Sequence, residues 1–319
     1  MRVLVTGSSG YLGQHFLNEL LQRPESNDIF AAYRSMDGFE DAVRSHPNVS
    51  DKKSNIHYIK LDLTSEKDVD EYFNHADSFD ICFHLAAISS PKVCQQDPSV
   101  AKAANVPVYF FDKLKNTPII ALSTDQVYCG TKAPYTEDNA VGPINTYAQT
   151  KVDMEKFLLS IESTSPGSKP RVCLRSSIIL GAESPFGKSH STFLHFCKSR
   201  EGVETTFYTD ECRSVISVLD VCRTLSHFLN AVQKGDEVES NVYNMGGPAR
   251  VSRLEMALEV ANHCGFDSSV FVSAEKSSQA PEENDVPSPL DITMSSTKLE
   301  ELVGLKFRGL MEAVKKTFS

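Results

Sequence analysis

The sequence lacks long hydrophobic runs and has a deficit of positive charge. No apolar stretch approaches the roughly 20 residues that a membrane-spanning helix needs, so we expect no membrane partner. The 42 acidic residues outnumber the 32 lysines and arginines, and the net charge is −10. This balance argues against a nucleic-acid backbone or an anionic membrane as the main partner, although it is compatible with a local basic pocket.

The chain also lacks C-x-x-C pairs and metal-ligand spacing among its histidines, and we expect no secretory leader. The eight cysteines are scattered along the chain, and several lie in apolar runs. This pattern predicts buried free thiols in a reducing cytosol. The apolar run in "MRVLVTGSSG" is only four residues long, which is too short for a signal peptide. We therefore expect a cytoplasmic protein without a metal site.

Short apolar stretches alternate with amphipathic ones through most of the chain. Strands are predicted over 2–7, 29–34, 56–63, 79–87, 118–125, 171–180 and 241–247, and helices over 11–24, 65–76, 146–161 and 252–266. This alternation predicts an α/β fold, a doubly wound parallel sheet of the Rossmann type with a smaller mixed α/β substrate lid. The larger domain should comprise 1–182 with a returning segment 214–247, and the lid 183–213 and 248–319.

Three glycines recur at a spacing of three between the first predicted strand and the first predicted helix. In "TGSSGYLG" they are Gly7, Gly10 and Gly13. In a dinucleotide fingerprint the first glycine permits a tight turn and the second lets the backbone approach a pyrophosphate, while the third lets helix and strand pack closely. The location favours a dinucleotide-binding domain over the alternative, a turn with a purely structural purpose.

The end of the second predicted strand bears on the choice of dinucleotide. An acidic residue there usually bonds the ribose 2′-hydroxyl of NAD, but this chain has Arg34 in "AAYRSMDG". A guanidinium suits a 2′-phosphate, and Ser9 could add a donor. We favour NADP over NAD; the alternative is that Arg34 is an ordinary solvated side chain.

Reduction of a carbonyl needs a proton donor, and a helical tyrosine followed four residues later by lysine is one solution. The lysine cation would favour the phenolate and so lower the tyrosine pKa. The pattern Y-x-x-x-K begins at Tyr109, Tyr128 and Tyr147. We select Tyr147 with Lys151, which open a clear helix, and Thr124, at the end of the fifth strand. The other two pairs are interpreted as structural.

Several motifs together resemble the extended short-chain dehydrogenases/reductases. They are "TGSSGYLG", "LDL", "HLAA", "STDQVYCG", "PINTYAQTK" and "LRSSIILG". The pattern is most similar to the dTDP-4-dehydrorhamnose reductase branch, which also includes the regulatory β subunit of methionine adenosyltransferase. The resemblance continues through "NVYNMGG" and "SPLDITMSSTKLEELVG", nearly to the end of the chain.

The resemblance implies a role for each matching position. Tyr147 would donate the proton, Lys151 would tune it and hold the nicotinamide ribose, and Thr124 would orient the substrate carbonyl. The residues implied in cofactor binding are Gly7, Ser9, Gly10, Tyr11, Leu12, Gly13, Arg34, Asp62, Leu63, Leu85, Ala86, Ala87, Tyr147, Lys151, Ser177 and Ile178. Those implied in substrate binding are Ser89, Thr124, Asp125 and Arg213, of which Arg213 would contact a sugar-nucleotide diphosphate.

Two departures from the family's pattern concern the substrate. Rhamnose-forming reductases place a tryptophan against the sugar where this chain has Ile178, and the chain contains no tryptophan at all. An arginine that helps to hold the diphosphate is replaced by Ser288, before Pro289. The cofactor half of the resemblance is therefore better supported than a dTDP-sugar substrate.

Three functions are open at this point. The first, which we favour, is an NADP-dependent oxidoreductase that reduces a carbonyl of a sugar nucleotide or related small molecule. The second is an NADP-binding regulatory subunit of a methionine adenosyltransferase or another enzyme partner. The third, an epimerase or dehydratase with bound NAD, fits less well because "STDQVYCG" offers only Asp125 as an acid and Arg34 disfavours NAD.

Overall fold

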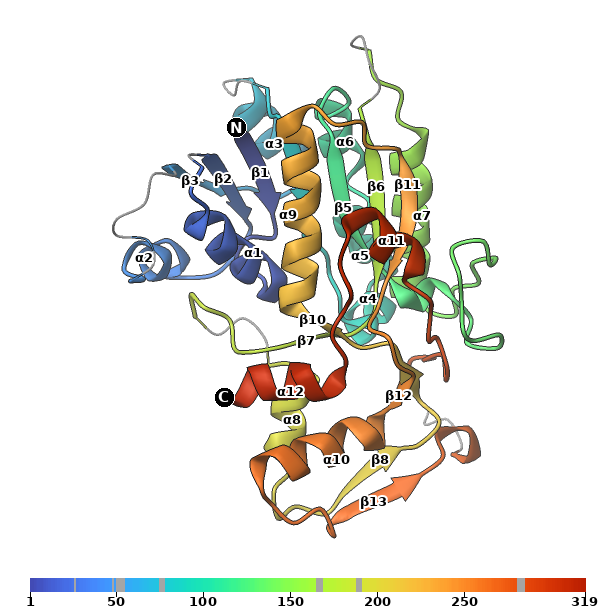
Figure 1. The fold of residues 1–319 in the computed structure, drawn as a ribbon. Helices are drawn as coiled ribbons and strands as arrows, with labels where there is room; N and C mark the ends of the chain where they lie inside the picture. Colours follow the sequence, from blue (N-terminus) through green and yellow to red (C-terminus); the bar gives the residue numbers. More distant parts are fainter. Residues whose placement is uncertain are drawn as a thin grey trace.

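The centre of the molecule is a seven-stranded parallel sheet (Figure 1). The computed structural model describes residues 1–25, 27–47, 49, 55–74, 78–164, 169–187, 191–279 and 285–319. In spatial order the strands are β11 (Asn241–Met245), β6 (Arg171–Ser176), β5 (Ile119–Thr124), β4 (Ile81–His84), β1 (Arg2–Thr6), β2 (Asp28–Tyr33) and β3 (Asn55–Lys60). The predicted doubly wound fold is confirmed. The strand order reverses between β1 and β4, where open parallel sheets bind their ligands.

Helices cover both faces of this sheet. One face carries α1 (Tyr11–Gln22), α2 (Phe39–Arg44), α9 (Val218–Lys234) and α11 (Thr297–Val303), which share one apolar cluster with the strands. The other face carries α3 (Glu66–Phe73), α6 (Val108–Lys113) and α7 (Thr146–Ser160) around a second cluster. The short helices α4 (Pro91–Gln96) and α5 (Pro98–Asn105) lie against α7. Val3 and Leu4 belong to opposite clusters because successive strand side chains alternate between faces.

Two of the differences from the sequence-based expectation concern the larger elements. α9 spans 17 residues and was not predicted, although its ends carry signals: the Ser217 side chain caps its first turn and Gly235 ends it in a left-handed conformation. The single strand predicted over 171–180 is wrong. It divides into β6 and β7 (Ile179–Leu180), and β7 pairs with β10 (Ile216–Ser217) outside the central sheet. The polar residues Arg175, Ser176 and Ser177 interrupt the apolar run at this break, and they were the available signal.

A smaller assembly lies below the carboxyl ends of the strands in Figure 1. It contains α8 (Phe193–Lys198), α10 (Arg253–Cys264), α12 (Leu310–Phe318) and the parallel pair β8 (Thr205–Tyr208) and β13 (Phe271–Ala274). The predicted helix 252–266 is confirmed as α10, which opens with a capping box between Ser252 and Glu255. β9 (Cys212–Arg213), which follows β8, and β12 (Val251–Ser252), which precedes α10, form an antiparallel pair. The predicted domain boundaries stay a prediction; α11, within 248–319, packs against β11.

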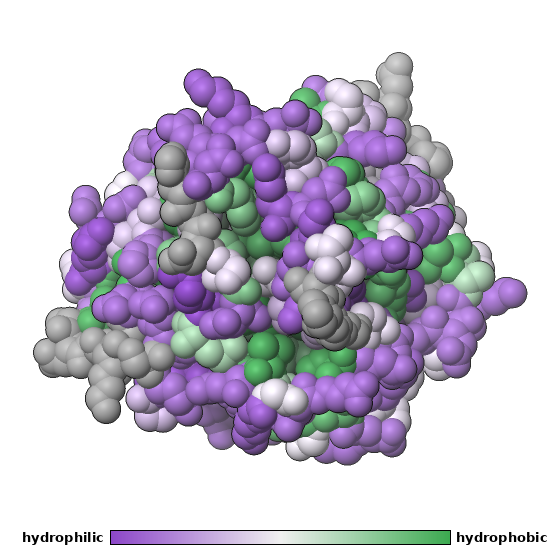
Figure 2. Space-filling model, turned by 90° about the horizontal axis from the view of Figure 1, so that it is seen from above, coloured by the Kyte–Doolittle hydropathy of each residue, from purple (hydrophilic) through white to green (hydrophobic). Residues whose placement is uncertain are grey.

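The opposite end of the molecule, over the amino ends of the strands, is seen in Figure 2. Hydrophilic residues (purple) dominate this face and surround smaller hydrophobic areas (green). Met1, Asp80, Pro118 and Lys169 line an open hollow at these strand ends. Among the described residues, no helix combines the length and apolar character required to cross a membrane. Parallel sheets bind ligands at their carboxyl ends, away from this hollow.

Candidate functional site

The turn between β1 and α1 depends on backbone approaches that a side chain would block. Gly7 has a φ of +69°, and a Cβ there would lie 2.7 Å from the backbone nitrogen of Ala86, after β4. A Cβ on Gly13 would lie 2.1 Å from the Gly7 carbonyl oxygen, and one on Gly10 3.1 Å from the same atom. The loop therefore folds tightly onto itself and onto the end of β4, just before α1 begins at Tyr11. The amino end of a helix in this setting favours a phosphate group.

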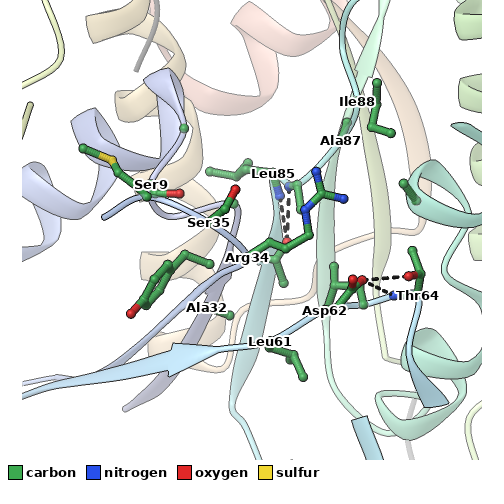
Figure 3. Close-up of a pocket in the computed structure, with 18 residues that line it drawn as sticks. Ser9, Ala32, Arg34, Ser35, Leu61, Asp62, Thr64, Leu85, Ala87 and Ile88 are labelled. Atoms are coloured by element: carbon green, nitrogen blue, oxygen red, sulfur yellow. Dashed lines mark hydrogen bonds between the residues drawn. The ribbon is translucent and has the colours of Figure 1, made fainter. Parts of the chain in front are cut away.

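A cavity of 420 Å³ lies beside this loop, at the carboxyl ends of the first strands (Figure 3). Its walls include Ser9 and Gly10 from the loop, Arg34 and Ser35 after β2, and Asp62 after β3. The Arg34 side chain extends into the cavity in Figure 3. The cavity thus offers the amino end of a helix on one side and a guanidinium among its lining side chains.

Asp62 remains a carboxylate acceptor at neutral pH. It accepts hydrogen bonds from the Thr64 backbone N–H at 2.9 Å and from the Thr64 hydroxyl at 2.7 Å. Burial acts to raise the pKa of Asp62, but these bonds and the Arg34 charge lower it below its ordinary value. The lining of the cavity therefore carries both an anion, Asp62, and a cation, Arg34.

A second cavity, of 410 Å³, adjoins the first and shares Gly7, Gly10, Leu85 and Ala87 with it. Thr124, at the end of β5, lines it together with Tyr147 and Lys151 from α7. The predicted site residues that line one or both cavities are Gly7, Ser9, Gly10, Tyr11, Leu12, Gly13, Arg34, Asp62, Leu63, Leu85, Ala86, Ala87, Ser89, Thr124, Asp125, Tyr147, Lys151, Ser177 and Ile178. Of the predicted residues, Arg213 lines neither cavity.

Burial governs the ionisation of the tyrosine and lysine. Tyr147 is 8% exposed and Lys151 is 2% exposed. Burial raises the pKa of Tyr147 well above its ordinary range, against a lowering by the neighbouring Thr124 hydroxyl. Burial also lowers the pKa of Lys151 to about 8, and its Nζ lies 3.2 Å from the Met154 sulfur. The predicted lowering of the tyrosine pKa is therefore wrong, because desolvation of the phenolate outweighs the hydrogen bond from Thr124.

The other two Y-x-x-x-K pairs lie outside both cavities. Tyr109 donates a hydrogen bond to Asp70 at 2.7 Å, and the Lys113 ammonium contacts the same carboxylate at 2.5 Å, on the surface between α3 and α6. Tyr128 is fully buried and its hydroxyl donates to Asn244 at 2.8 Å. These contacts agree with the structural interpretation of both pairs.

Arg213 is directed into the protein. Its guanidinium donates to backbone carbonyls of Cys212 at 2.7 Å, Leu290 at 2.9 Å and Pro289 at 3.0 Å. Ser288, which stands where the family pattern has an arginine, contacts the guanidinium at 3.4 Å. These donors hold the chain around 288–290 in place, so they are not available to a diphosphate in this geometry.

Comparison with known proteins agrees with this arrangement of strands and helices. A family model described as the RmlD substrate binding domain matches residues 1–319. The chain belongs to the RmlD substrate binding domain family. The predicted dTDP-4-dehydrorhamnose reductase-like branch is thereby confirmed.

Three proteins illustrate what this RmlD-family chain is similar to. The "Methionine adenosyltransferase 2 subunit beta" of Mus musculus is 25% identical over 281 residues, which cover 84% of this chain and 73% of that protein. A dTDP-4-dehydrorhamnose reductase from Bacillus anthracis, in complex with NADP, has a TM-score of 0.74 at 18% identity over 99% and 98% of the two chains. The UDP-glucose 4-epimerase of Bifidobacterium longum, in complex with NAD+ and UDP, has a TM-score of 0.77 at 20% identity over 99% and 96%. At these identities the solved structures show the fold alone.

A buried ion pair behind the second cavity was not anticipated from the sequence of this RmlD-family chain. Arg175, in β6, contacts Glu155 of α7 at 2.8 Å, with side-chain exposures of 8% and 5%. Ser123 donates to the same carboxylate at 2.5 Å, and Arg175 donates to the Tyr128 hydroxyl at 2.9 Å. Glu155 follows Lys151 by one helical turn, and this spacing, which places both on the same helix face, was the available sign that Glu155 points inward. The network therefore ties the helix that carries Tyr147 and Lys151 to β5 and β6.

The burial of Lys151 leads to a testable stability effect. Its pKa is lowered from 10.5 to about 8 on folding, so the unfolded chain binds more protons between these values and wild-type stability rises with pH across that window. Lys151→Met, which removes the buried charge, should raise the free energy of unfolding at pH 7 by about 3 kcal/mol. The gain should shrink above pH 8 and vanish above pH 10.5, as measured by urea unfolding along a pH series. Lys156→Met, at an exposed position of the same helix, is the control and should show no such pH-dependent gain.

Proposed function

We propose that this protein is an NADP-dependent oxidoreductase that reduces a carbonyl of a sugar nucleotide or a related small molecule. The proposal is carried by the meeting of Thr124, Tyr147 and Lys151 in a cavity that adjoins the glycine-rich one. A proton donor beside a candidate dinucleotide site is the arrangement that carbonyl reduction requires.

The residues of the first cavity fit a nicotinamide dinucleotide. The glycine cradle at the start of α1 suits a pyrophosphate. Arg34 and Ser35 would hold a 2′-phosphate, Asp62 would lie beside the adenosine, and Lys151 would hold the nicotinamide ribose. When bound, this cofactor supplies the hydride.

In this proposal Tyr147 gives the new alcohol oxygen its proton. The raised pKa keeps the phenol protonated at neutral pH, which suits a donor in the reducing direction. Thr124 would orient the carbonyl by a hydrogen bond from its hydroxyl. Lys151, with a pKa of about 8, carries a positive charge at pH 7 and would stabilise the phenolate left after proton transfer.

Arg34→Asp should reverse the cofactor preference. The substitution removes the guanidinium that would bond the 2′-phosphate and puts a like charge in its place, so NADPH affinity should fall about 10- to 100-fold. NADH affinity should hold or improve, because a carboxylate suits a ribose 2′-hydroxyl. Titration followed by nicotinamide fluorescence measures both. Arg44→Asp, on the exposed side of α2, is the matched control. If Arg34→Asp bound NADPH as tightly as Arg44→Asp, Arg34 would have no part in the selection of NADP over NAD.

Two observations support a sugar nucleotide or a related small molecule as the substrate: the relatives of the chain and the polar residues around Tyr147. Ser89, Asp125 and Gln126 line the same cavity and could bond the hydroxyls of a sugar. Arg213 is engaged by backbone carbonyls, so a diphosphate would need another anchor. The test is NADPH oxidation over a panel of 4-keto sugar nucleotides and the matching free keto sugars. No turnover on any of them would count against the oxidoreductase proposal.

A second candidate function is that of an NADP-binding regulatory subunit. The 25% identity to the mouse methionine adenosyltransferase subunit over 84% of this chain favours it, as does the engagement of Arg213. Affinity purification from native extract separates the two candidates. A stoichiometric enzyme partner without reductase turnover supports the regulatory role, and turnover without a stable partner contradicts it.

A cytoplasmic location is proposed on the state of the thiols. All eight cysteines are free, and most are buried, which suits a reducing compartment. Cell fractionation with the native chain tests the location directly.

A further inference from the structure

A short segment crosses the amino-terminal half of α1 between the two parts of the molecule. Residues 182–187, which we call the strap, follow β7 and lead toward α8; in Figure 1 this segment passes beneath α1 toward α2. The Tyr11 hydroxyl donates to the Ala182 carbonyl at 3.0 Å, and His15 Nε2 lies 3.2 Å from the same oxygen. Farther along, Phe186 is 2% exposed and belongs to the main apolar core. The strap is thus attached to the sheet domain at both ends.

The Gln14 side chain joins the strap to the glycine-rich loop. It has no exposed surface. Its Nε2 donates to the Ser9 carbonyl at 2.9 Å and to the Gly187 carbonyl at 3.3 Å, while its Oε1 accepts the Phe186 N–H at 2.8 Å. A primary amide has two N–H donors beside an acceptor oxygen. Glutamine can therefore satisfy all three backbone groups, and no apolar or acidic side chain of similar size can.

The same side chain contacts two walls of the first cavity. Ser9 belongs to one wall and Met36, just after Arg34 and Ser35, to the other. The Met36 sulfur lies 3.7 Å from Gln14 Nε2. On the strap side, a Cβ placed on Gly187 would lie 3.1 Å from the Met36 methyl carbon. Gln14 is therefore in contact with both the cavity and the strap.

We propose that Gln14 is a positioning residue that couples occupancy of the first cavity to order in the strap. A dinucleotide whose phosphates contact the glycine-rich loop fixes the Ser9 carbonyl, and this fixes the amide that holds residues 186–187. Because coupling is reciprocal, loosening the strap must weaken dinucleotide binding. This inference rests on the proposed function only because it takes NADP as the ligand of the first cavity.

Amide hydrogen exchange of the full chain, with and without NADP+, tests this coupling. NADP+ should slow exchange over 182–187 in the wild type. Gln14→Met keeps the side-chain volume but leaves the Ser9 carbonyl, the Gly187 carbonyl and the Phe186 N–H without their bonds to the amide. Exchange over 182–187 should become about ten-fold faster without ligand, the slowing by NADP+ should be lost, and NADP+ should bind about ten-fold more weakly. Gln22→Met, at the exposed end of the same helix, is the control and should change none of these values.

Phe186→Ala tests the coupling from the strap side, since Phe186 lines neither cavity. It should also weaken NADP+ binding, by about five-fold or more. Unchanged affinity in Phe186→Ala, or unchanged strap protection in Gln14→Met, overturns the proposal. Thermal unfolding checks that each variant is folded, and Phe186→Leu and Gln14→Asn, which keeps an amide on a shorter side chain, replace any that is not. A wild type that binds no nicotinamide dinucleotide refutes the proposed function instead, while ligand-free exchange in Gln14→Met still supports or overturns the role of the amide.

Discussion

Tyr147→Phe should reduce carbonyl turnover by about 10²- to 10⁴-fold, the range expected when a general acid is lost. The substitution removes one oxygen from a side chain that is 8% exposed and leaves the packing of the ring in place. NADPH affinity should stay within about three-fold of wild type, because the cradle, Arg34 and Lys151 are untouched. Steady-state rates at saturating NADPH, together with fluorescence titration of NADPH, measure the two effects separately.

Tyr109→Phe is the matched control for that experiment. It makes the same chemical change in a second Y-x-x-x-K pair, whose tyrosine bonds Asp70 on the surface and lines neither cavity. Its turnover should equal that of the wild type. Turnover that survives Tyr147→Phe at the level of Tyr109→Phe would remove Tyr147 from the mechanism. Loss of NADPH binding in Tyr147→Phe would instead assign the hydroxyl to the cofactor site.

Local signals in the sequence sufficed for the sheet and for most of the cavity walls. The glycine spacing, the residues after β2 and β3, and the pair Tyr147 and Lys151 all lie at the carboxyl ends of parallel strands or in the first turns of the helices that follow. In a doubly wound sheet these positions converge at the switch point whatever the details of packing. A sequence that alternates strands and helices therefore predicts which residues meet, although it does not predict how they ionise.

The features that sequence reasoning missed depend on contacts between distant parts of the chain. Gln14 bonds Phe186 across 172 residues, and Arg213 bonds Pro289 across 76. No local pattern distinguishes an arginine that grips a ligand from one that holds backbone carbonyls. The pKa of Tyr147 was also wrongly expected to fall, because its degree of burial is set by the assembled walls of the cavity rather than by the lysine four residues away.

Glu155→Gln should lower the free energy of unfolding by about 3–5 kcal/mol, the cost of leaving a buried charge without its partner. Arg175 loses a carboxylate that it contacts with two nitrogens and keeps a guanidinium that is 8% exposed. Urea unfolding at pH 7 measures the effect. Asp153→Asn, on the same helix, breaks the exposed pair with Lys102 at 3.6 Å and should cost at most about 1 kcal/mol.

A double variant tests whether the loss in Glu155→Gln comes from the unpaired charge. Glu155→Met with Arg175→Met replaces both charged groups by apolar ones of similar size, so it should recover part of the stability that either single change removes. The Ser123 hydroxyl and the Tyr128 hydroxyl would still lose a partner, so recovery should be incomplete. The single variants Glu155→Met and Arg175→Met give the reference values. If the double variant loses more stability than these two lose together, the pair acts through packing of α7 against β6, and the charge itself is incidental.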